Sequence, residues 1–146
     1  MLTITAKPLT LRRVVEKVLV MKMSANPKKV MIIEDDADIR DSMSESLSMI
    51  GVTALVAANG REALDLLVNS NELPSCIFLD LMMPVMDGWE FRTNQMKNSR
   101  IANIPVVIIT ADGNAKDKAL KMSANAGIRK PIELDDLFEV ALKYCG

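Results

Sequence analysis

Short apolar runs alternate with amphipathic segments along most of the chain. The apolar runs occupy residues 29–34, 52–57, 75–80, 105–110 and 128–130. Their length and the Gly, Pro and Asn residues that separate them are typical of buried strands. The pattern therefore predicts five strands.

After each of these runs, apolar residues recur at the spacing of a helix. The expected helices span residues 37–49, a segment capped by Asn59 and ending near Asn69, and residues 89–97, 114–124 and 133–144. Regular alternation of strands and helices predicts an α/β fold, in which helices cover both faces of a parallel sheet. The crossovers are expected to be right-handed.

Residues 1–27 do not continue this alternation and are treated as an N-terminal basic amphipathic extension to a domain at residues 28–146. Residues 9–21 carry apolar side chains at helical spacing, and Asn26-Pro27 breaks the chain. The favoured interpretation is an upstream extension of little function, because Met21 and Met23 are plausible alternative starts. The alternatives are a helix that packs on the domain or a partner, and a helix that lies on an anionic membrane surface.

Composition narrows the class of protein. The chain has 146 residues, of which 49% are hydrophobic and 25% charged, as in one soluble globular domain. Residues 1–29 hold seven Lys or Arg and one acid, a net charge of +6, which leaves −7 for the remainder. A domain with this negative charge is a poor ligand for nucleic-acid phosphates, so no direct nucleic-acid partner is expected.

The chain contains no histidine, which excludes a Ser-His-Asp triad, a His-ligated zinc site and a role as phosphohistidine donor. Cys76 and Cys145 lack metal-ligand spacing and are interpreted as reduced thiols of a cytoplasmic protein. No apolar run is long enough to span a bilayer, and charged residues interrupt any signal-peptide pattern.

Polar side chains collect where the predicted strands end. The acids Glu34, Asp35 and Asp36 end the first strand, and Asp80 ends the third. Thr110 and Lys130 end the fourth and fifth strands. Because the carboxyl ends of parallel strands lie at one edge of the sheet, these side chains are expected close together. Two carboxylates about 4 Å apart repel by roughly 4 kcal/mol at an effective dielectric near 20. Lys130 alone cannot offset several acids, so the set indicates a hard divalent cation, Mg²⁺ or Mn²⁺.

A carboxylate, a divalent cation, an ammonium and a hydroxyl together suit phosphoryl transfer to aspartate. Mg²⁺ and Lys130 would neutralise the transferring group, and Thr110 would donate a hydrogen bond to it. Asp80 would become the acyl phosphate.

The sequence resembles the receiver domain of two-component response regulators over about residues 28–145. The matching motifs are VMIIEDDADIR (Val30–Arg40), FLDLMMPVMDG (Phe78–Gly88), VVIITA (Val106–Ala111) and RKP (Arg129–Pro131). The resemblance implies a flavodoxin-like, doubly wound sheet of strand order 2-1-3-4-5 with five helices. It also implies a phosphohistidine donor, either a sensor histidine kinase or a histidine phosphotransfer protein, and an unknown downstream protein.

The resemblance also implies roles for individual residues. Asp80 is the expected phosphoacceptor, with Thr110 and Lys130 on the phosphoryl group. Asp35 is expected to hold Mg²⁺ directly and Glu34 through water, with the Met82 carbonyl as a further ligand beside Asp80. Asp36 lies one residue past the usual acidic pair.

Two departures from the family pattern affect these expectations. Relatives usually carry Tyr or Phe where Gly127 stands, so a backbone movement of residues 125–130 is the alternative to ring rotation. The chain ends after the last predicted helix, which predicts a stand-alone receiver. Members of the family often pair through the surface of the last strand and its neighbouring helices, so a homodimer is a further expectation from the resemblance.

Three functions remain open at this point. The favoured one is a Mg²⁺-dependent phosphoacceptor that is not an enzyme beyond self-catalysed phosphotransfer and slow dephosphorylation. The second is an interaction module in which phosphorylation is vestigial. The third is a phosphohydrolase, which is disfavoured because Met82 stands where such enzymes commonly carry a general acid. The Met82 side chain is either a packing residue or an apolar border to the path of attacking water.

Overall fold

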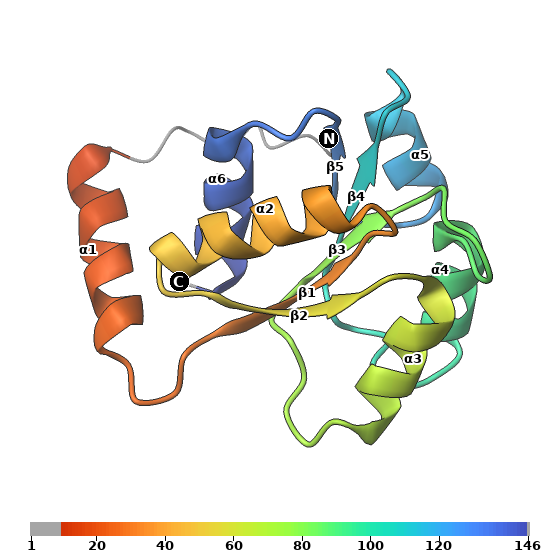
Figure 1. The fold of residues 1–146 in the computed structure, drawn as a ribbon, viewed down its shortest axis with the longest axis horizontal. Helices are drawn as coiled ribbons and strands as arrows, with labels where there is room; N and C mark the ends of the chain where they lie inside the picture. Colours follow the sequence, from red (N-terminus) through yellow and green to blue (C-terminus); the bar gives the residue numbers. More distant parts are fainter. Residues whose placement is uncertain (1–9, 146) are drawn as a thin grey trace.

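The computed structural model describes residues 10–145 and contains one five-stranded parallel sheet of order β2-β1-β3-β4-β5 (Figure 1). Its strands are β1 (Lys29–Ile33), β2 (Thr53–Ala57), β3 (Ile77–Asp80), β4 (Val106–Thr110) and β5 (Ala126–Arg129). The side chains of β3 and β4 are all buried, as the apolar runs predict. The predicted α/β fold and strand order are confirmed.

Helices cover both faces of the sheet (Figure 1). The helices are α1 (Leu11–Met23), α2 (Ala37–Met49), α3 (Gly60–Asn69), α4 (Gly88–Met96), α5 (Ala115–Lys121) and α6 (Leu134–Cys145). Helices α3, α4 and α5 enclose one apolar core, which includes Phe91 and Ile108. Helices α2 and α6 enclose the second, which includes Leu47 and Phe78.

Side chains cap the start of four helices, with Thr10 at α1 and three further residues at the helices that follow β1, β2 and β3. Asp36, Asn59 and Asp87 each accept hydrogen bonds from backbone N–H groups of the first turn of α2, α3 and α4. These donors have no partner within the helix, so a capping oxygen stabilises each start. The predicted cap at Asn59 is confirmed, with 2.9 Å between its Oδ1 and the Glu62 nitrogen.

The largest error in the predicted boundaries concerns α5. The prediction of a helix over residues 114–124 is too long, because the helix ends at Lys121. Ser123 has a φ of 53°, in the left-handed region that ends a helix. The chain then turns early enough for β5 to begin at Ala126 instead of residue 128.

Helix α1 lies beside α6 at the edge of the domain (Figure 1). Met21 is only 4% exposed and packs with the half-buried Val14 and Val18 against the core under α2 and α6. This is the arrangement that the second interpretation of the extension describes. Residues 1–9 lie outside the described part, and the division between residues 27 and 28 stays a prediction. None of the helices in residues 10–145 is both long enough and apolar enough to cross a membrane.

Candidate functional site

The parallel sheet brings charged residues from three separate strands together at the carboxyl end of the sheet. Glu34 follows β1, Asp80 ends β3, and Lys130 follows β5. The Lys130 ammonium lies 2.5 Å from Glu34 Oε1 and 3.5 Å from Asp80 Oδ2. Lys130 therefore bridges two carboxylates that are 46 residues apart in the sequence.

Asp35 completes an acidic cluster with Glu34 and Asp80. Each of the three offers a carboxylate oxygen, and these oxygens lie within 4.8 Å of one another. Glu34 is fully buried and Asp80 is 4% exposed, whereas Asp35 is exposed. The site thus opens to solvent on the Asp35 side.

Burial and charge change the proton affinities of Asp80 and Lys130. Burial first, and the adjacent Glu34 second, raise the pKa of Asp80 from 3.8 to about 7, although Lys130 acts in the opposite direction. Burial alone would lower the pKa of Lys130, but its contacts with Glu34 and Asp80 outweigh that effect and raise it. Lys130 is therefore a permanent cation, and Asp80 holds its proton more tightly than an ordinary aspartate.

The donor set fits a divalent cation. Glu34 Oε1 is buried, and its one close cation among the described residues is the Lys130 ammonium, with which it makes an ion pair. Three carboxylates need more positive charge than Lys130 supplies. Oxygen ligands of this kind suit Mg²⁺, so Glu34, Asp35 and Asp80 would hold it.

The third acid of the triplet has a different position. Asp36 Oδ1 accepts hydrogen bonds from the Asp38 and Ile39 nitrogens at 2.9 and 3.2 Å, and so caps α2. The Asp36 N–H donates to Glu34 Oε2 at 3.2 Å. Asp36 thus orients Glu34 through its backbone, while its own carboxylate is used at the helix start.

The connection from β3 to α4 folds tightly around Asp80. The Met82 N–H lies 3.4 Å from Asp80 Oδ1, and the Gly88 N–H donates to the Leu81 carbonyl at 3.0 Å. A Cβ atom at Gly88 would lie 2.5 Å from the Asp80 carbonyl oxygen, so only glycine permits this approach. The Met82 side chain is 76% exposed, so it does not act as a core packing residue.

Thr110 ends β4, and its strand pairs with that of Asp80 on one side and with β5 on the other. It is 3% exposed, and its hydroxyl oxygen accepts a hydrogen bond from the Asp112 N–H at 3.2 Å. The hydroxyl hydrogen is free of that interaction and available to a further acceptor. Asp112 itself pairs with Lys118 at 2.8 Å, and this pair lowers the pKa of Asp112.

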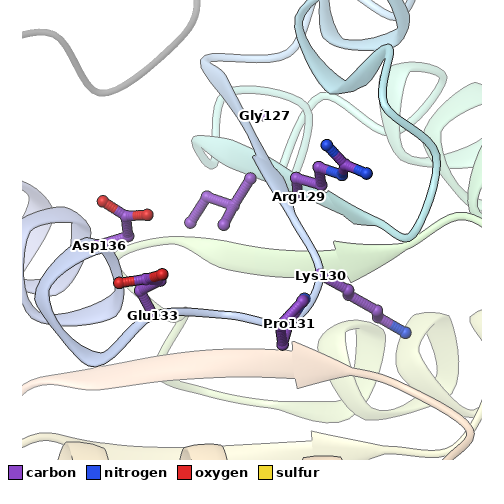
Figure 2. Close-up of a pocket in the computed structure, with 7 residues that line it drawn as sticks. Gly127, Arg129, Lys130, Pro131, Glu133 and Asp136 are labelled. Atoms are coloured by element: carbon purple, nitrogen blue, oxygen red, sulfur yellow. The ribbon is translucent and has the colours of Figure 1, made fainter.

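Gly127 leaves no room for a ring in the described conformation. A Cβ atom there would lie 2.5 Å from the Ala115 carbonyl oxygen. Beside Gly127, a cavity of about 500 Å³ opens toward the start of α6 (Figure 2). Lys130 also lines that cavity, and Figure 2 shows its side chain pointing away from Glu133 and Asp136.

Sequence reasoning missed two arginines. Arg40 of α2 donates to the Glu34 and Asp35 carbonyl oxygens at 2.7 and 3.4 Å. Arg92 of α4 is 8% exposed and donates to the Met122 and Ser123 carbonyl oxygens. Arg40 lies within the first quoted motif, but no local signal distinguishes its role or that of Arg92 from the role of a solvated helix residue.

Comparisons with known proteins agree with this geometry. A family model described as "Response regulator receiver domain" matches residues 30–142. The chain is 35% identical over 112 residues to "Probable transcriptional regulator ycf27" of Guillardia theta, which covers 75% of this chain and 42% of that protein. It is 32% identical over 113 residues to "Response regulator MprA" of Mycolicibacterium vanbaalenii, which covers 76% of this chain and 47% of that protein.

The fold also matches solved structures. The chemotaxis response regulator CheY4 of Vibrio cholerae aligns with a TM-score of 0.72 and 27% identity, over 80% of this chain and 98% of that one. The chain spans about half the length of the curated relatives, 42% and 47% for the two above. The strand order, the acidic cluster with its lysine and the family match together show that this chain belongs to the response regulator receiver domain family.

Proposed function

We propose that Asp80 accepts a phosphoryl group from a phosphohistidine of a partner protein, in a reaction that requires Mg²⁺. The observation that carries this proposal is the cluster of Glu34, Asp35 and Asp80 with Lys130 against two of its members. A permanent ammonium and a cation site beside one buried carboxylate suit the charge of an incoming phosphoryl group. Phosphorylation would then alter partner binding or pass the phosphate on.

In this proposal Asp80 supplies the nucleophile. Its carboxylate oxygen forms the new bond to phosphorus, the N–P bond of the phosphohistidine breaks, and the electron pair of that bond returns to the imidazole nitrogen, which takes a proton from water. Only the ionised carboxylate can attack, and Lys130 favours that form. When bound, Mg²⁺ neutralises charge on the phosphoryl oxygens.

Lys130 and Thr110 have separate tasks. Lys130 faces Asp80 Oδ2 at 3.5 Å and supplies a positive charge on that side of the acceptor. The Thr110 hydroxyl donates a hydrogen bond to a phosphoryl oxygen, for which its hydrogen is available. The new acyl phosphate is thereby held by groups from β4 and from the segment after β5.

A protein donor has a place to dock beside the site. A cavity of about 490 Å³ between α2 and the connection from β5 to α6 is lined by Ile39, Met43, Leu134 and Leu137, and reaches Lys130. Leu134 is 47% exposed. An apolar side chain of a histidine kinase or histidine phosphotransfer protein fits there while its phosphohistidine faces Asp80.

The site suits a phosphoacceptor better than a phosphohydrolase. A hydrolase needs a proton donor for the leaving group, and the residue two positions after the acceptor, where such enzymes commonly carry it, is Met82, which cannot transfer a proton. We therefore assign no separate enzyme activity, and expect only self-catalysed phosphotransfer and slow loss of the phosphate. The transcriptional role in the name of one relative is not carried over, since the match covers under half of that protein.

The test uses the full chain with Mg²⁺ and phosphoramidate, a small donor with an N–P bond. Intact-mass measurement should show one added phosphoryl group that is stable in acid and lost in base. Asp80→Asn should abolish the gain, whereas Asp65→Asn on the exposed face of α3 should leave it unchanged. An undiminished gain in Asp80→Asn, or no gain in the parent protein, would contradict the proposal.

Gly127 favours a second candidate, an interaction module that does not respond to phosphorylation. The close contact between Gly127 and Ala115 fills the space in which a switching ring would lie. For such a module, binding of a captured partner would be the same with and without beryllofluoride, which mimics the phosphoryl group. A changed affinity would exclude it.

A further inference from the structure

Arg40 ties the start of α2 to the end of β1, directly behind the acidic cluster. Its Nη1 donates to the Glu34 carbonyl oxygen at 2.7 Å and lies 3.4 Å from the Asp35 carbonyl oxygen. We propose that Arg40 is a positioning residue for the divalent cation: its guanidinium holds the Glu34–Asp35 backbone so that both carboxylates face Asp80. This inference rests on the proposed function.

The backbone at this point needs such a donor. The Glu34 N–H still pairs with β2, through the Ala57 carbonyl at 3.0 Å. The carbonyls of Glu34 and Asp35 lie past the end of β1, where the ladder of the sheet no longer supplies donors. Arg40, in the first turn of α2, reaches back with a rigid planar group that can serve both carbonyls.

Other contacts fix Glu34 but not Asp35. The Glu34 carboxylate is held by Lys130 and by the Asp36 N–H, and Asp36 is fixed as the cap of α2. Asp35 is exposed, and the contact recorded for its backbone carbonyl is the one with Arg40. The backbone that carries the Asp35 carboxylate, the ligand on the open side of the cluster, is therefore held mainly by Arg40.

Positioning and simple electrostatics predict opposite results. No carboxylate lies within ion-pair distance of Arg40 among residues 10–145, so its charge acts on the site without a direct partner. If Arg40 acted only through its charge, its removal would strengthen the binding of a dication. If it positions the ligands, its removal weakens that binding, as loss of the residues that orient metal ligands generally does.

The experiment measures the affinity of unphosphorylated full-length protein for Mg²⁺ by calorimetry, with Mn²⁺ binding by electron paramagnetic resonance as a second readout. Arg40→Met should lower the affinity by about tenfold. Arg40→Lys keeps the charge and one donor group, and should recover part of the loss. Arg61→Met is the matched control, because Arg61 is an exposed residue of α3 paired only with Asp65 among the described residues, and it should not change the affinity.

Two further results separate the possible failures. If the parent protein binds no Mg²⁺, the proposed function fails; if it binds and Arg40→Met binds equally or more tightly, only the positioning role is overturned. Unfolding in chelator reports whether each variant is folded. If Arg40→Met does not fold, Arg40→Lys decides: weakened Mg²⁺ binding with parent-like unfolding supports the role, and unchanged binding overturns it.

Discussion

Helices α4 and α5 are neighbours on one face of the sheet, and each follows a strand that carries a site residue, Asp80 for α4 and Thr110 for α5. Their attachment to the domain is very different. Helix α4 has nine residues and is held by the Asp87 cap at its start, by Arg92 in its middle and by Gln95 in its last turn. Helix α5 has seven residues, and its N-cap residue Asn114 makes no capping hydrogen bond with its side chain.

The attachment of α4 is a buried polar network. Arg92 donates to the Gln95 side-chain oxygen at 2.8 Å and to the carbonyls of Met122 and Ser123 at 3.1 and 2.7 Å. The Gln95 amide donates to the carbonyls of Ile101 and Ile104 in the loop before β4, and these two bonds complete the network. These bonds join α4 to the loop before β4 and to the end of α5.

The difference shows which end of α5 is free to respond. Arg92 fixes the end of α5. The start of α5 depends on the close contact of Ala115 with Gly127 and on the exposed loop that contains Gly113. Since Thr110 precedes this loop, we expect a change at Thr110 to move the start of α5 and leave α4 in place.

The largest expected effect is on the network that holds α4. Arg92→Leu leaves three oxygen atoms without this donor, two of them buried, and should lower the free energy of unfolding by about 3 kcal/mol. Urea unfolding measures the loss. Arg61→Leu, at an exposed position, should change it by less than about 0.5 kcal/mol. A loss of similar size in both variants would remove the distinction between α4 and an ordinary surface helix.

The contact under α5 should be the next most sensitive. Gly127→Ala places a Cβ against the Ala115 carbonyl at 2.5 Å and should cost about 2 kcal/mol, because backbone atoms must shift. Gly113→Ala is the matched control, because nothing lies within 4 Å of a Cβ at that position. Thermal unfolding of both variants checks the difference. Equal stability would show that the contact of Ala115 with Gly127 does not hold the start of α5.

Protonation should distinguish the acceptor carboxylate from that of Asp112. The raised pKa of Asp80 means that the folded, metal-free protein binds a proton that the unfolded chain releases between pH 3.8 and about 7. Stability should therefore fall as the pH rises through this window, by roughly 2 kcal/mol.

Urea unfolding in chelator at several pH values measures this dependence, and Asp80→Asn should remove most of it. The pKa of Asp112 is lowered, so its contribution has the opposite sign and is lost only as the pH falls. A parent protein whose stability rises between pH 4 and 7 would contradict the environment assigned to Asp80.

The helix caps should show a smaller contrast. Asp87 accepts a hydrogen bond from the Glu90 N–H at 2.9 Å, so Asp87→Ala should cost about 1 kcal/mol. Asn114→Ala removes no capping bond, and should cost less than about 0.5 kcal/mol. Chemical unfolding of the two variants tests the claim, which would be wrong if Asn114→Ala proved the more damaging.

The smallest expected effect concerns the lifetime of the phosphate rather than stability. Met82 is exposed beside the acceptor and presents an apolar group to attacking water. Met82→Asn should shorten the lifetime of phosphorylated Asp80, because an amide can hold a water molecule there. Decay of the phosphorylated mass species gives the rate, with Met96→Asn as an exposed control on α4. Equal decay rates would assign Met82 no such role.

Much of the architecture was predictable from local pattern. Buried strands need apolar runs, so the strands could be located in the sequence. Parallel strands place their carboxyl ends at one edge of the sheet, so Glu34, Asp80 and Lys130 could be expected to lie close together. The cap at Asn59 could be predicted in the same way, because it depends only on neighbouring residues. Boundaries were harder: nothing in the residue type of Ser123 announces a left-handed conformation, so the end of α5 was placed too late.

The sequence alone therefore determined the order of elements, the class of fold and the chemistry available at the edge of the sheet. Only the tertiary structure decided how that chemistry is supported: that Arg40 turns back to the Glu34 carbonyl, and that Arg92 is buried against the end of α5. Polar side chains on a helix have the same local pattern whether water or distant carbonyls satisfy them. The choice depends on contacts between residues far apart in the chain, such as Arg92 and Ser123, and these exist only once the helices are packed.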